Sequence, residues 1–124
     1  MKIIARLLTI AIPVLLISSC NTNDPDLVDP ILGTYYGAMN VSDPSFQSTA
    51  YSVVVSQVNS DVVKITPSGS AGSQWTAHLT RVAGVYTCIS CVLNNQITFT
   101  KVNGVYNLTY NYDDNNEQFT GQQQ

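Results

Sequence analysis

The chain has 124 residues, of which only 10% are charged, and its five Lys or Arg and eight Asp or Glu give a formal net charge of −3. This length fits a single domain and is too short for a catalytic α/β domain with a second lobe. The acidic balance, with no basic stripe interleaved with aromatic residues, excludes nucleic acid and an anionic membrane surface as electrostatic partners.

The N-terminus has the pattern of an export signal. Lys2 and Arg6 precede an apolar run over residues 7–17, and these 11 residues are well short of the roughly 20 that cross a bilayer as a helix. The ending Ile17-Ser18-Ser19-Cys20 resembles a bacterial lipobox. We therefore expect residues 1–19 to be removed as a lipoprotein signal peptide, and the membrane to be a partner through acylated Cys20. The expected location is the bacterial cell envelope, at the periplasmic or surface face of the outer membrane.

The residues after the signal predict a tether and one domain. Residues 20–30 are polar, contain two Pro and lack periodicity, which is typical of an extended lipidated tether. Signal removal leaves three basic and eight acidic residues, a formal charge of −5 for the mature chain. Residues 31–124 form the domain.

From Ile31 onward, apolar and polar residues alternate, which is typical of strands packed on one side only. Along residues 105–112, for example, Tyr106, Leu108 and Tyr110 share one face, opposite Asn107 and Thr109. The pattern predicts an all-β domain of eight strands, at about residues 33–41, 50–58, 61–66, 74–82, 84–89, 95–102, 105–112 and 116–122.

Turn signals separate these segments. Asn103-Gly104 is the strongest, because a type I′ hairpin turn needs positive φ at both central residues. Ala83-Gly84 and Asn59-Ser60 are placed to close further hairpins. Longer polar loops are expected at residues 42–45, 67–73 and 113–116.

Short connections favour an antiparallel meander. Eight meandering strands either close into a small barrel, which removes the exposed edges, or split into a β-sandwich, and we favour the barrel. Closure is expected to pair Phe119-Thr120-Gly121 with Gly33-Thr34-Tyr35.

The opening of the first strand carries a resemblance. Gly33-Thr34-Tyr35-Tyr36-Gly37 follows the tether directly, and Gly33-Thr34-Tyr35 is similar to the Gly-x-Trp start of lipocalins. The chain resembles the small lipocalin-like (calycin-like) barrel lipoproteins of Bacteroidetes-type bacteria, with a similar strand order over residues 31–122. This resemblance implies a fold and a location more than an activity.

Cys88-Ile89-Ser90-Cys91 is the sharpest internal motif. Such a pair serves as a redox dithiol, as half of a zinc site or as a structural disulfide. It ends a predicted strand and does not begin a helix, which argues against redox use. Only His78 remains as a further soft ligand once Cys20 is lipidated, which argues against zinc. In an exported chain we expect a Cys88–Cys91 disulfide that fixes the turn.

No other pattern indicates catalysis. His78 is the only histidine, alternation places it on the solvent face of its strand, and no Gly-x-Ser-x-Gly elbow accompanies it. Asp113 and Asp114 lie in a predicted turn, where Asp is favoured for backbone reasons. Phosphate-loop, EF-hand and dinucleotide fingerprints are absent from the sequence. We expect neither an enzyme nor a metal or cofactor.

The aromatic residues suggest the function. An eight-stranded barrel either fills its interior or leaves room for one small ligand. We expect a non-catalytic barrel that binds a small apolar or aromatic ligand in its mouth. The alternative is a filled barrel that acts as a structural, inhibitor or protein-interaction module toward an extracellular protein, through loops 42–49, 67–73 and 113–116. The candidate ligand-lining residues are Tyr35, Met39, Trp75, Phe99, Tyr106 and Tyr110.

Overall fold

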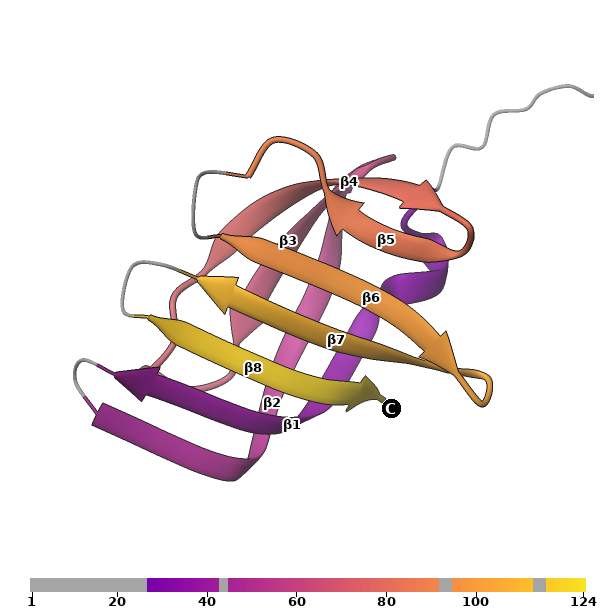
Figure 1. Ribbon diagram of the computed structural model, residues 1–124. Helices are drawn as coiled ribbons and strands as arrows, with labels where there is room; N and C mark the ends of the chain where they lie inside the picture. Colours follow the sequence, from indigo (N-terminus) through magenta and orange to yellow (C-terminus); the bar gives the residue numbers. More distant parts are fainter. Residues whose placement is uncertain (1–26, 43–44, 92–94, 113–115) are drawn as a thin grey trace, which may run out of the picture.

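The computed structural model describes residues 27–42, 45–91, 95–112 and 116–124, so Cys20 and the pair Asp113 and Asp114 lie outside the described residues. Eight strands follow one short 3-10 turn (Figure 1). The elements are η1 (Asp29–Ile31), β1 (Gly33–Ser42), β2 (Ser45–Asn59), β3 (Val62–Pro67), β4 (Trp75–Val82), β5 (Val85–Cys88), β6 (Gln96–Val102), β7 (Val105–Tyr112) and β8 (Glu117–Gln123).

The strands form a closed antiparallel barrel. Each pairs with the next in sequence, and β8 returns to pair with β1. This confirms the eight-stranded meander and decides against the sandwich. Because the sheet closes on itself, each strand has a partner strand on both sides, which lowers the aggregation risk of an open sheet.

Two hairpin turns have the predicted geometry. Asn103 and Gly104 have φ values of 54° and 83°, and Ala83 and Gly84 have values of 53° and 81°. These positive values match a type I′ turn, whose twist suits the flanking strands. The third turn lies one residue later than predicted, because a register shift between Gln57 and Asn59 extends β2.

The first part of β2 corrects the prediction. Residues 45–49 were expected in a loop, but they continue β2 and pair with β1 as far as Ser42–Ser45. Between the pairs Gly37–Tyr51 and Met39–Ser48, two residues of β2 lie opposite Ala38. This bulge bends β2 sharply, and the hairpin beyond it leaves the curve of the barrel (Figure 1).

The closing register is also corrected. Phe119 pairs with Met39 and Gly121 with Gly37, so β8 is shifted by four residues from the predicted pairing with Tyr35 and Gly33. An even shift keeps the same side chains inside, so the alternation alone does not distinguish the two registers. The two glycines do distinguish them, because a Cβ on Gly37 would meet the backbone of Thr120 and Gly121.

The two ends of the barrel differ. The tether end carries η1 and the turns at residues 60–61, 83–84 and 103–104, and the loop end carries the other four connections (Figure 1). η1 and the residue before it close the tether end with the fully buried side chains of Ile31 and Val28. The hydroxyls of Tyr35 and Tyr86 donate to the carbonyls of Ile31 and Leu27, each at 2.8 Å.

Candidate functional site

The six candidate ligand-lining residues form the core of the barrel. Side chains that border a cavity large enough for water keep some accessible surface, and four of the six keep almost none. Their rings pack edge to face, with 5.7 Å between the centroids of Tyr35 and Phe99. The interior beside them is therefore filled. The exposed fractions are 0% for Tyr35 and Phe99, 1% for Met39 and Tyr110, and 8% for Trp75 and Tyr106, which reach the ends of the barrel.

The cysteines and the histidine lie apart from this core. Cys88 and Cys91 form a disulfide at the loop end, with Cα atoms 5.8 Å apart. His78 is exposed, and its Nε2 lies 2.8 Å from Oδ2 of Asp61, a partner that the sequence did not indicate. Among the residues described, no group of three or more His, Cys, Asp or Glu could hold a metal ion.

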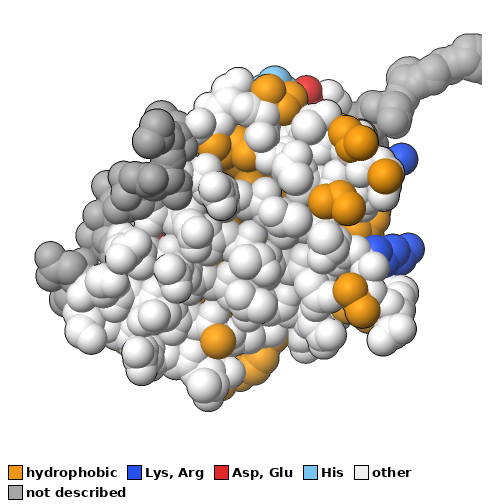
Figure 2. All heavy atoms as spheres, viewed as in Figure 1, with side chains coloured by type: hydrophobic (Ala, Val, Ile, Leu, Met, Phe, Trp, Pro, Cys, Tyr) orange, Lys and Arg blue, Asp and Glu red, His pale blue; other side chains and the backbone are white. Residues whose placement is uncertain are grey.

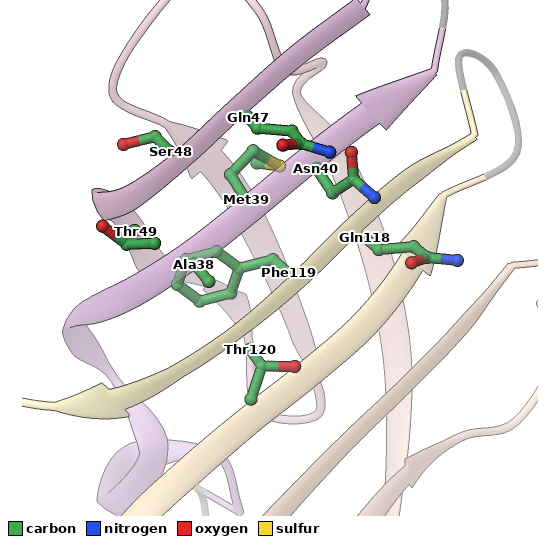
Figure 3. A pocket seen from close by; sticks show the side chains of 9 residues that line it. All are labelled: Ala38, Met39, Asn40, Gln47, Ser48, Thr49, Gln118, Phe119 and Thr120. Atoms are coloured by element: carbon green, nitrogen blue, oxygen red, sulfur yellow. The ribbon is translucent and has the colours of Figure 1, made fainter.

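The outer surface of the barrel carries a groove of about 710 Å³ where β8, β1 and β2 run side by side (Figure 3). Asn40 pairs across the strands with both Gln47 and Gln118, and their amide ends lie in a line. Met39 and Phe119 lie beneath the groove with their side chains in the core. The bulge opposite Ala38 lies at the groove, since Ala38 and the bulge residue Thr49 both line it.

The groove belongs to a larger uncharged face. The line of amides continues in register through Asn111 of β7 to Gln96 of β6, forming an amide row across five strands. Beside it runs a row of threonines, and no charged side chain lies in either row. Figure 2 shows this face almost entirely white, with the Lys and Arg side chains at its margin. The threonine row is Thr80, Thr87, Thr98, Thr109 and Thr120.

A second set of polar groups is buried at the loop end. Glu117 has no exposed surface, and neither carboxylate oxygen has a hydrogen-bond partner. The hydroxyl of Tyr110 and Nε1 of Trp75 are buried without partners as well. Burial raises the pKa of the Tyr110 hydroxyl well above its usual value, and the nearby charge of Glu117 raises it further. We call Glu117, Tyr110 and Trp75 the mouth cluster.

Glu117 was not predicted from the sequence as a site residue. The signal was its position two residues before Phe119, which places both side chains on the inward face of β8. An acidic residue on an inward face is exceptional, because burial of an unpaired charge is costly.

No family model matches this chain, and neither a curated protein nor a solved structure matches it. No helix in the described ranges is long and apolar enough to cross a membrane.

Proposed function

We propose that the protein is a lipoprotein of the bacterial envelope, anchored through Cys20, whose filled, non-catalytic barrel binds a neutral glycan on its uncharged face. The observation that carries this proposal is the contrast between a packed interior and an outer groove lined by amides and hydroxyls. This proposal keeps the filled barrel that the sequence offered as the alternative hypothesis. It differs in the partner, which is a glycan and not an extracellular protein.

The chemistry of the groove supports a neutral, hydroxyl-rich partner. Each amide offers donors and an acceptor, and each threonine offers a hydroxyl that does both. Neighbouring side chains across paired strands lie about 5 Å apart, so the groups form a regular array. Contact with a neutral chain removes no ion from water, which keeps the desolvation cost low.

An aromatic side chain lies next to the array. Tyr36 is on the same face of β1 as Ala38 and Asn40, and 49% of it is exposed. A phenol ring that is half exposed gives an apolar surface with a polar end, which suits a sugar ring with apolar faces and hydroxyl edges.

The sequence supports the anchor, and the position of η1 is compatible with it. Residues 27–30 enter the barrel at the tether end, so the loop end and the distal part of the groove lie opposite the point where the chain enters. The closed meander is also compatible with membership of the lipocalin-like barrel lipoproteins, which we retain as a proposal.

The test is binding of the detergent-solubilised protein to an array of neutral and acidic glycans. The double variant Asn40→Asp and Gln118→Glu puts two charges into the groove with little change in shape, and we expect it to lose binding to neutral glycans. Ser56→Asp adds a charge on the outward face of β2, away from the groove, and should bind as the unmodified protein does. Equal binding by both variants, or capture of proteins but of no glycan, would overturn the proposal.

A further inference from the structure

The mouth cluster is exceptional within this barrel because its polar groups lack partners. Three other buried phenols have them: Tyr35 and Tyr86 donate to carbonyls of the segment around η1, and the hydroxyl of Tyr51 accepts the backbone N–H of Gly69 at 3.0 Å. Buried polar groups are nearly always hydrogen-bonded, so three unmatched side chains in one place call for an explanation.

The three groups form one connected site. The ring of Trp75 packs edge to face on Tyr110, with centroids 5.5 Å apart, and stacks on Tyr112 at 5.0 Å. Tyr112 is the cross-strand partner of Glu117, and the charge of Glu117 acts on Tyr110. A carboxylate thus lies among several aromatic rings at the mouth of the barrel.

The described residues do not supply the missing positive charge. Arg81 and Lys101 lie over the rings of Tyr86 and Tyr106, at 5.8 and 5.6 Å, toward the tether end. Lys64 lies on the outward face of β3. The ion pair found among these residues joins His78 to Asp61 and does not involve Glu117. An uncompensated carboxylate in a chain of negative net charge favours a cationic occupant.

We propose that the mouth cluster binds a small organic ammonium ion that also carries an oxygen acceptor, as an amino alcohol does. The ammonium group pairs with the carboxylate of Glu117, and the faces of the surrounding rings stabilise its charge. The oxygen of the ligand accepts hydrogen bonds from Nε1 of Trp75 and the hydroxyl of Tyr110. One ligand of this kind therefore matches all three unpartnered groups, and the proposal is independent of the glycan groove.

The loop between β3 and β4 covers the site. Gly72 lies directly over Glu117, since a Cβ on Gly72 would come within 3.3 Å of Oε2 of Glu117 and 2.7 Å of the ring of Pro67. Two hydrogen bonds hold the start of the loop, from the N–H of Ser68 to the carbonyl of Ser52 and from the N–H of Gly69 to Tyr51, each at 3.0 Å. With the loop in this position Glu117 has no exposed surface, so both the space for a ligand and its entry require the loop to lift, at the end of the barrel opposite η1.

Trp75 is the only tryptophan, so its fluorescence reports directly on the site. The experiment titrates the full protein with choline and with ethanolamine, and with dimethylbutanol, the uncharged carbon isostere of choline. We expect a saturable change in emission with the two cations and none with dimethylbutanol. No saturable change with either cation, or equal binding of dimethylbutanol, would overturn the proposal.

Two variants test the named contacts. Glu117→Gln keeps the shape and removes the charge, and we expect it to weaken choline binding at least tenfold, with a folded protein verified by its thermal transition. Tyr110→Phe removes one donor and should weaken binding by a smaller factor. Unchanged affinity in folded Glu117→Gln would contradict the proposed pairing.

The same ammonium chemistry occurs free in solution and as a lipid head group. Phosphatidylcholine vesicles, added in place of choline, separate these sources. A change in Trp75 emission with choline but not with vesicles assigns the site to a free ligand. A change with vesicles at a choline concentration lower than free choline requires assigns it to a lipid head group. A change with neither rejects the site.

Discussion

The two ends of the barrel differ in whether their buried polar groups have hydrogen-bond partners. At the tether end, η1 inserts apolar side chains into the barrel. Carbonyls in and around η1 accept hydrogen bonds from the hydroxyls of Tyr35 and Tyr86 and from the side-chain amide of Gln123. At the loop end, Glu117, Tyr110 and Trp75 are buried without partners. The difference indicates that the tether end serves stability, whereas the loop end carries polar groups that stability alone does not explain.

The largest effect on stability is expected from truncating the buried side chain of η1. Ile31 is fully buried, so Ile31→Ala leaves a cavity beneath η1 and should lower the free energy of unfolding by about 2–5 kcal/mol. Denaturant unfolding measures it, and the exposed Val82→Ala, which we expect to change stability by less than about 0.5 kcal/mol, is the control. A loss as small as that of the control would mean that η1 does not close the barrel.

Alkaline pH should destabilise both ends. Burial raises the pKa of Tyr35 and of Tyr110 in the folded state, so folding favours the protonated phenols. Stability is therefore full below the unfolded pKa of about 10 and falls as the pH rises above it, by up to about 1.4 kcal/mol per pH unit for each phenol. Thermal unfolding between pH 8 and 11 measures this, and a flat profile would show that neither phenol is sequestered.

The Cys88–Cys91 disulfide should contribute little to the free energy of unfolding. Cys88 and Cys91 are three positions apart, so their bridge restrains a very short loop of the unfolded chain. The double variant Cys88→Ser and Cys91→Ser should lower stability by no more than about 2 kcal/mol and leave the fold intact. Far-UV circular dichroism with denaturant unfolding measures both, and unfolding of this variant without denaturant would assign the disulfide a far larger role.

Alternation and turn residues were enough to predict the meander. Asn103-Gly104 fixed a hairpin by its local backbone preference, and the inward faces followed from the period of two. The start of β2 was missed because residues 45–49 are mostly polar and project beyond the core, where pairing with β1 holds them. The closing register depends on contacts between Gly37 and Gly121, which are distant in sequence.

The sites were harder to predict than the strands. Whether Tyr35 and Phe99 fill the interior or line a cavity depends on packed volumes, which composition does not determine. The amide row depends on the register of five strands, so Asn40 and Gln118 have no visible relation in the sequence. The disulfide was the exception, because the spacing of Cys88 and Cys91 brings them together locally.

The contrast between the ends is tested most directly by removing one hydroxyl from each. Tyr35→Phe leaves the carbonyl of Ile31 unpaired and should lower the free energy of unfolding by about 1–2 kcal/mol. Tyr110→Phe breaks no hydrogen bond and should change it by less than about 0.5 kcal/mol or increase it. The measurement is denaturant unfolding of the two variants in parallel at neutral pH. Equal losses, or a larger loss for Tyr110→Phe, would contradict the assignment of the stabilising hydrogen bonds to the tether end.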